Sequence, residues 1–152
     1  MDVFKEDWQL SQFWYSKETT DVIIQEVLAH TNSESRIACI STPTVFVKLK
    51  SIIPPLKQII NLFEFDTRFD IYVDPPFLSE DCFTKTMITV RWLGKKDNCK
   101  ILLCTGAVMQ NLADRLINAR VTSFYPQHQG GLANEFRCYI NYQSQNIKLK
   151  EN

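Results

Sequence analysis

Strand-like and helix-like segments alternate along almost the whole of this 152-residue chain, and the alternation limits the folds open to it. Short apolar runs rich in β-branched and aromatic residues indicate strands, whereas apolar residues at helical spacing indicate helices. The expected strands are residues 36–41, 58–65, 69–73, 100–104, 121–125 and 135–142. The expected helices are residues 17–30, 42–52, 79–94 and 109–117. This pattern predicts an α/β fold with a mostly parallel sheet, in which the last two strands can pair antiparallel.

Helix boundaries are marked by five residues. Ser16 and Ser79 each precede a helix and can accept a hydrogen bond from a first-turn N–H group. Thr42 and Pro43 mark another start, because proline is favoured in the first turn. Gly94 follows the third helix and predicts its end.

The composition is that of an ordinary soluble globular protein, with 45% hydrophobic and 22% charged residues. We expect one domain over residues 1–143, followed by a polar and loose tail at residues 144–152. No apolar run approaches the ~20 residues of a membrane span. The acidic N-terminal stretch also lacks the features of a signal peptide, so neither a membrane nor a secreted location is expected.

The charges are balanced, with 17 Lys and Arg residues against 17 Asp and Glu residues. Because non-specific binding of nucleic acid depends on an excess of basic residues, this balance argues against a nucleic-acid partner. The five cysteines form no Cys-x-x-Cys motif, and their number is odd. They indicate reduced, mostly buried thiols in a cytoplasmic protein, and neither histidine lies at ligand spacing from a cysteine pair, so no metal site is expected.

The four residues Asp74, Pro75, Pro76 and Phe77 follow the expected strand at 69–73. The prolines have a fixed φ and no N–H, so they stiffen the turn and leave carbonyl groups free. Asp74 and the Pro75 carbonyl can both accept hydrogen bonds from one amino group, and Phe77 offers a face for a base or an alkylammonium ion. The motif alone fits equally a strand-terminating turn capped by the aspartate.

Other polar residues follow the first two strands. Ser41 and Thr42 come directly after the first strand, at the N-terminus of a helix, where backbone N–H groups can bind a polar ligand. Glu64 and Asp66 stand 22 and 24 residues after Thr42 and can bind the ribose hydroxyls of an adenosine cofactor. An ordinary α/β turn and exposed strand-end acids are the alternatives. Parallel strands place all these residues at one edge of the sheet, where α/β folds bind ligands.

Two further segments are candidates for substrate contact. Trp14 and Tyr15 belong to a run of three aromatic residues, which cannot all point into one core, so part of the run should cover a pocket or hold a substrate. Asn134 begins the stretch Asn134-Glu135-Phe136-Arg137, which follows a glycine-containing loop, is polar near the expected sheet edge and could contact substrate. Core packing for the aromatic residues and a solvated loop for Asn134 are the alternatives.

Six segments carry a resemblance to a known family. They are residues 9–16, 36–39, 63–69, 74–80, 100–106 and 132–139. Together they resemble the seven-strand, S-adenosylmethionine-dependent lysine methyltransferases of translation elongation factor 1A, once classed as N6-adenine-specific DNA methyltransferases because of the Asp-Pro-Pro-aromatic motif. The glycine-free first turn is also similar to that family. The resemblance extends from about residue 7 to residue 142 and implies a class I, Rossmann-like fold.

The resemblance also implies residue roles. Glu64 or Asp66 would hold the ribose of S-adenosylmethionine. Asp74 and the Pro75 carbonyl would orient the lysine nitrogen of elongation factor 1A, and Phe77 would border the substrate channel. The sulfonium already activates the methyl group, so the enzyme mainly positions a neutral amine for in-line attack.

One departure from the family lies in front of Asp74. Only eight residues, 66–73, separate Phe65 from Asp74. Parallel strands need a crossover of ~12 or more residues. We therefore expect an internal deletion of roughly 30 residues, the size of one strand–helix unit, that removes the adenine side of the cofactor pocket. An N6-adenine nucleic-acid methyltransferase and a catalytically impaired variant are the alternative functions.

Overall fold

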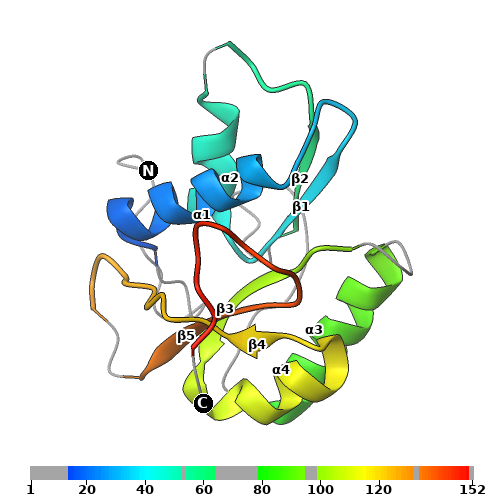
Figure 1. Cartoon of the computed structure of the whole chain (residues 1–152), viewed down its shortest axis with the longest axis vertical. Coiled ribbons are helices and arrows are strands. Elements are labelled where there is room, and N and C mark those ends of the chain that lie inside the picture. The colour runs from blue at the N-terminus through cyan, green and yellow to red at the C-terminus, as the bar shows by residue number, and fades with distance from the viewer. Residues whose placement is uncertain (1–13, 53, 64–78, 95–98, 132–133, 151–152) are drawn as a thin grey trace. The chain divides into compact units, whose positions relative to one another are not determined.

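The computed structural model describes residues 14–52, 54–63, 79–94, 99–131 and 134–150. The chain divides into two compact units. The first comprises Met1–Pro75 with Gln127–Gly131, and the second comprises Pro76–Pro126 with Leu132–Asn152. The expectation of a single domain stays a prediction. The described parts of both units are mixtures of helix and strand, as the sequence predicts (Figure 1).

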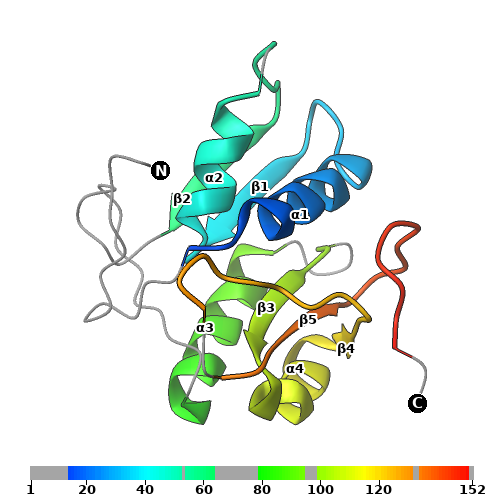
Figure 2. The ribbon, with the colours of Figure 1, turned by 90° about the vertical axis from the view of Figure 1, so that its left-hand side faces the viewer.

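The described part of the first unit contains two helices and a parallel pair of strands. Its elements are α1 (Lys17–Ala29), β1 (Arg36–Ile40), α2 (Pro43–Lys50) and β2 (Ile59–Phe63). The register of the pair runs from Arg36 opposite Ile59 to Ile40 opposite Phe63. α2 packs on both strands and α1 packs on α2 (Figures 1 and 2). All four elements are confirmed within two residues at the ends that the structure describes.

The described part of the second unit contains an antiparallel sheet with two α-helices on one face. Its elements are α3 (Glu80–Leu93), β3 (Leu102–Gly106), the short helix η3 (Ala107–Met109), α4 (Gln110–Ile117), β4 (Arg120–Val121) and β5 (Phe136–Ile140). The strand order is β3-β5-β4, and both pairings are antiparallel. The expected pairing of the last two strands is confirmed. The expectation of a mostly parallel sheet is wrong for the described strands, which form one parallel and two antiparallel pairs.

The helix starts confirm two of the three expected caps. Ser16 accepts a hydrogen bond from the Thr19 N–H at 3.2 Å, and Ser79 accepts one from the Cys82 N–H at 3.3 Å. Thr42 stands at the cap of α2 but makes no side-chain capping bond.

Apolar side chains from the strands and helices of the second unit form its core. Phe83 and Tyr139 are fully buried there, and Met87 and Leu103 are nearly so. Because alternate residues of a strand point to opposite faces, Leu103 and Tyr139 define the face that α3 and α4 cover. Burial also raises the pKa of the Tyr139 hydroxyl to about 12.

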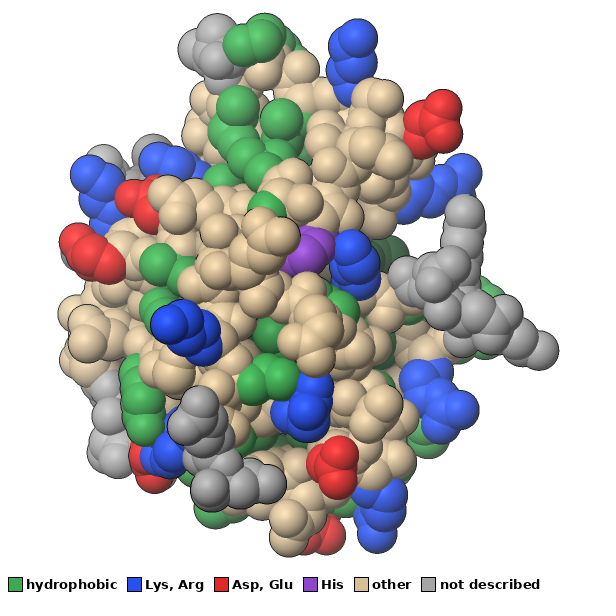
Figure 3. Space-filling model, in the orientation of Figure 1, with side chains coloured by type: hydrophobic (Ala, Val, Ile, Leu, Met, Phe, Trp, Pro, Cys, Tyr) green, Lys and Arg blue, Asp and Glu red, His purple; other side chains and the backbone are tan. Residues whose placement is uncertain are grey.

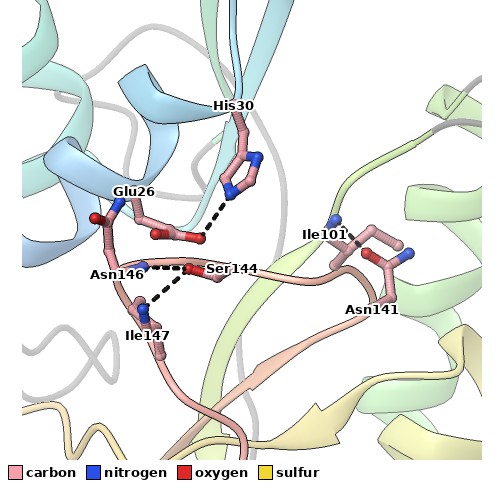
Figure 4. A network of polar contacts seen from close by, with 7 residues as sticks. All are labelled: Glu26, His30, Ile101, Asn141, Ser144, Asn146 and Ile147. Carbon is pink, nitrogen blue, oxygen red and sulfur yellow. Dashed lines mark hydrogen bonds and ion pairs between the residues drawn. The ribbon is translucent and has the colours of Figure 1, made fainter.

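Residues 144–150 differ from the loose tail that we expected. Ser144 accepts hydrogen bonds from the backbone N–H groups of Asn146 at 3.0 Å and Ile147 at 2.9 Å (Figure 4). Ile147 is 3% exposed. The Lys148 carbonyl accepts a bond from the Ser123 N–H at 2.8 Å, so this stretch extends the strand pairing beyond β4. The tail is polar in composition yet anchored by its backbone.

Among the helices that the structure describes, none combines the length and the apolar character that a membrane-spanning helix requires.

Candidate functional site at the ends of β1 and β2

The carboxyl ends of β1 and β2 lie together at one edge of the first unit. Ile40 and Phe63 form the last pair of the parallel register. Just beyond it, the Ser41 N–H donates a hydrogen bond to the Phe63 carbonyl at 2.7 Å. The turn after β1 therefore starts beside the point where β2 ends, as expected for parallel strands. This edge is where ligands bind in α/β folds.

Ser41 combines an unusual backbone conformation with an unpaired hydroxyl. Its φ is +51°, in the left-handed region that non-glycine residues adopt rarely. Its Oγ is buried and has no hydrogen-bond partner in the part of the chain that the structure describes. A buried unpaired polar group costs about 1–3 kcal/mol, and a strained backbone is common at functional sites. Both observations fit a position that contacts a polar ligand.

The N-terminus of α2 adds hydrogen-bond donors at the same edge. The first N–H groups of a helix have no acceptor within it, and they carry a partial positive charge. Pro43 lacks an N–H, so the donors are those of the residues that follow it. The Thr42 side chain does not cap them. This arrangement can bind a ligand with acceptor oxygens, such as a carboxylate.

Cys39 lies in β1 beneath the turn and was not among the predicted site residues. Its side chain is 4% exposed, and this burial raises the pKa of the thiol to about 11. A hydrogen bond with the Thr42 side chain lowers that pKa in part. The Thr42 side chain thus contacts the strand below it.

The buried thiol predicts a loss of stability at alkaline pH. An ordinary cysteine in the unfolded chain ionises near pH 9, whereas folded Cys39 stays protonated until about pH 11. Because the unfolded state then binds fewer protons, the free energy of unfolding should fall by about 2–3 kcal/mol between pH 9 and 11. Urea unfolding of the Cys39→Ala variant should lack this part of the fall. The control variant Cys82→Ala should retain it, and an unchanged fall in Cys39→Ala would contradict the assignment.

The predicted residues Glu64, Asp66 and Asp74 lie outside the described residues, as do Pro75, Pro76 and Phe77. Their roles stay predictions. The structure does place the last described residue of β2, Phe63, beside Ser41. Glu64 follows Phe63 directly in the sequence.

Trp14 and Tyr15 are held in the first unit by residues 127–129. The Gln129 N–H donates to the Trp14 carbonyl at 2.8 Å, and the Tyr15 ring stacks at a tilt on His128 with 5.0 Å between ring centroids. The two aromatic side chains are 3% and 7% exposed. Both described members of the aromatic run are therefore buried. Residues 127–129 lie more than 110 positions away in the chain, so no local pattern in the sequence could have indicated this contact.

Asn134 is exposed and lies just before β5 in the second unit. Nearby, Arg137 forms an ion pair with Glu135 and lies over the Tyr125 ring at 4.3 Å from its centroid. The Arg137 side chain is 16% exposed, and its Nη1 atom is buried without a partner among the described residues. Arg137 belongs to the stretch at residues 134–137 for which substrate contact is a prediction.

The sequence matches a family described as "Probable N6-adenine methyltransferase" over residues 6–73 and 70–144. The human protein named EEF1A lysine methyltransferase 1 is 40% identical, covering 93% of this chain and 78% of the human protein. The zebrafish (Danio rerio) protein of that name is 39% identical, covering 89% of this chain and 98% of its own length. The Saccharomyces cerevisiae protein-lysine N-methyltransferase EFM5 is 34% identical, covering 98% of this chain and 77% of the yeast protein.

These comparisons also bear on the short link before Asp74. The alignment with the human relative spans 170 positions, whereas 93% of this chain is about 141 residues, so about 29 positions hold no residue of this chain. The family match is divided into two segments that meet at residues 70–73, directly before Asp74. The size agrees with the deletion expected from the sequence. The chain thus belongs, in a shortened form, to the family of protein-lysine N-methyltransferases that includes EEF1A lysine methyltransferase 1.

Proposed function

We propose that this protein transfers a methyl group from S-adenosylmethionine to a lysine side chain of translation elongation factor 1A. The observation that carries the proposal is the similarity to EEF1A lysine methyltransferase 1 over 93% of the chain. Six segments of the sequence, including the Asp-Pro-Pro-Phe motif, resemble the same family. We further propose that the protein acts in the cytoplasm. The five cysteines are not in disulfides in the structure, as is usual in a reducing compartment.

S-adenosylmethionine is the proposed cofactor, and its sulfonium supplies the reactive methyl group. Ser41, Thr42 and the N-terminus of α2 would bind its polar atoms. The buried unpaired Oγ of Ser41 supports this role, since a ligand acceptor or donor would satisfy it. We propose that Glu64 or Asp66 binds the ribose hydroxyls. The parent fold is the seven-strand, Rossmann-like sheet, from which one strand–helix unit would be missing here.

The target lysine is proposed to enter beside the Asp74 motif. Asp74 and the Pro75 carbonyl would accept hydrogen bonds from the amine and fix its direction of attack. An amine attacks only when neutral, and removal from water beside a cation lowers the pKa of a lysine. Phe77 would border the channel of the lysine chain and help to keep water out. Other substrate contacts are proposed for Trp14, Tyr15, Pro76 and Asn134.

A second candidate function is methyl transfer to the N6 atom of adenine in a nucleic acid. The description of the matching family favours it. The charge distribution does not, because the chain has no net charge. On the face shown in Figure 3, Lys and Arg side chains are interspersed with Asp and Glu side chains rather than gathered in a band. Binding to a polyanion would draw on such a band.

A methylation assay with the full chain separates these functions. Recombinant elongation factor 1A and an adenine-containing DNA duplex are each incubated with the protein and labelled S-adenosylmethionine. We expect label on the protein substrate alone, located on a lysine by mass spectrometry. Label on the DNA alone would reverse the choice of substrate. An absence of label on both, together with no heat of cofactor binding at high micromolar concentration, would identify a catalytically impaired variant.

A further inference from the structure

Cys104 of β3 and Cys138 of β5 stand directly opposite each other in the antiparallel sheet of the second unit. Residues of an antiparallel pair alternate between hydrogen-bonded and non-hydrogen-bonded positions. The Ala107 N–H donates to the Glu135 carbonyl at 2.8 Å, which marks that pair as a hydrogen-bonded position. Cys104 and Cys138 form the third residue pair from that one in the same register. Because the two kinds of position alternate from pair to pair, the cysteines occupy a non-hydrogen-bonded position.

Two other hydrogen bonds support this assignment. On the far side of the cysteine pair, the Asn141 N–H donates to the Ile101 carbonyl at 3.4 Å, again three steps away. The Cys138 carbonyl is directed away from β3, because it accepts a bond from the Thr122 N–H at 2.9 Å beside β4. The backbone of Cys138 thus bonds to the strand on its other side.

The position brings the two thiols close together. Opposed residues at non-hydrogen-bonded positions have Cα atoms about 4.5 Å apart, and their side chains share one face of the sheet. A disulfide requires Cα atoms about 4.4–6.8 Å apart, so the backbone already meets the condition for a bridge. The shared face is opposite to that of Leu103 and Tyr139, on which α3 and α4 pack.

We propose that Cys104 and Cys138 are a redox pair that forms a reversible cross-strand disulfide when the protein meets a hydroperoxide. Neither Cys104 nor Cys138 is in a disulfide in the structure, which therefore shows the reduced form. Cys104 is 8% exposed and Cys138 is fully buried. An oxidant as small as hydrogen peroxide reaches Cys104 first, and Cys138 is the resolving thiol.

The oxidation proceeds in two balanced steps. The Cys104 thiolate attacks one peroxide oxygen, the O–O bond breaks, and a sulfenic acid and a hydroxide ion form. The Cys138 sulfur then attacks the sulfenic sulfur, so that the S–S bond forms while the S–O bond breaks and water leaves. In sum, two thiols and one hydrogen peroxide give one disulfide and two waters. A dithiol reductant reverses the reaction by thiol–disulfide exchange.

The disulfide would tie the two ends of a segment that contains α4 and β4. Closing this loop restricts the unfolded chain. We expect the melting temperature to rise by about 10 °C on oxidation and to return on reduction.

The test treats the reduced full chain with hydrogen peroxide, blocks the remaining thiols and maps the peptides without reduction. The expected product is a cross-linked pair of peptides containing Cys104 and Cys138, about 2 Da lighter than the two reduced peptides together. The product should disappear on treatment with dithiothreitol. Recovery of both cysteines as blocked thiols, or a cross-link between other cysteines, would overturn the proposal. This part of the test needs only the wild-type chain, so it does not depend on whether a variant folds.

Serine variants supply the matched comparison. Cys104→Ser and Cys138→Ser should each lose the cross-link and the rise in melting temperature. Cys99→Ser, which removes a partly buried thiol outside the pair, should keep both. A rise in melting temperature that persists in Cys104→Ser would show that the stabilisation has another origin and would contradict the proposal.

Discussion

Replacing Asp74 with alanine should lower kcat/KM for methyl transfer to elongation factor 1A by about 100-fold or more, the size of effect seen when a positioned catalytic hydrogen-bonding group is removed. The proposed role of the carboxylate is to accept a hydrogen bond from the lysine amine and to direct its lone pair at the methyl group. Without it, the amine loses the orientation that in-line attack requires. The measurement is the initial rate of label transfer at saturating cofactor.

Two matched variants locate the effect. Asp74→Asn keeps an acceptor oxygen and should lose much less activity than the alanine variant. Asp81→Ala removes an exposed carboxylate that pairs with Lys85 on α3, and it should leave the rate unchanged. Cofactor affinity, measured by calorimetry, should be the same in all three. A rate within about three-fold of the wild type in Asp74→Ala would rule out the assigned role, because that loss is only about 0.6 kcal/mol.

The helices and their starts were predictable because their signals are local. Ser16 and Ser79 cap α1 and α3 through bonds to residues three positions later. Gly94 ends α3, and its N–H bonds to the Val90 carbonyl. The start of α3 at Ser79 and its end at Gly94 can each be recognised from a few neighbouring residues in the sequence. The apolar periodicity that indicates each helix is likewise contained within the helix itself.

The strand pairings were less predictable because they depend on residues far apart in the chain. β3 begins two residues later than expected. Before it, the Ile101 N–H donates to the Asn141 side chain at 2.8 Å and not to the Asn141 carbonyl, and the same side chain donates to the Cys99 carbonyl at 3.0 Å. β4 is short, and the chain beyond it pairs with the segment around Lys148. The polar composition of that segment gave no sign of this pairing.

The candidate site was predictable in its place and only partly in its details. Alternating strands and helices were sufficient to place Ser41 and Thr42 at the sheet edge. The left-handed backbone of Ser41 and the contact of Thr42 with Cys39 depend on how the turn packs over β1. The burial of Tyr15 against His128 depends on a contact across more than 110 residues. Such contacts have no periodic signature in the sequence.

Restoring the missing segment should strengthen cofactor binding. The proposed variant inserts, between Phe65 and Asp74, the residues of the human relative that have no counterpart here, about 29 positions. The eight residues now in place are fewer than the ~12 needed to connect parallel strands, whereas the insert supplies a full strand–helix unit. We expect the dissociation constant for S-adenosylmethionine, measured by calorimetry, to fall at least about ten-fold, equivalent to about 1.4 kcal/mol.

The effect must come from the sequence of the insert and not from its length alone. A Gly/Ser linker of equal length relieves the short connection but supplies no adenine contacts, so it should leave the affinity near that of the natural chain. The reciprocal experiment removes the same residues from the human relative and should weaken its cofactor binding by a similar factor. If the natural chain and both insertion variants bind the cofactor equally, the shortened chain already has a complete cofactor site. The short link between Phe65 and Asp74 would then only connect the neighbouring segments in a different way, without removing part of the cofactor pocket.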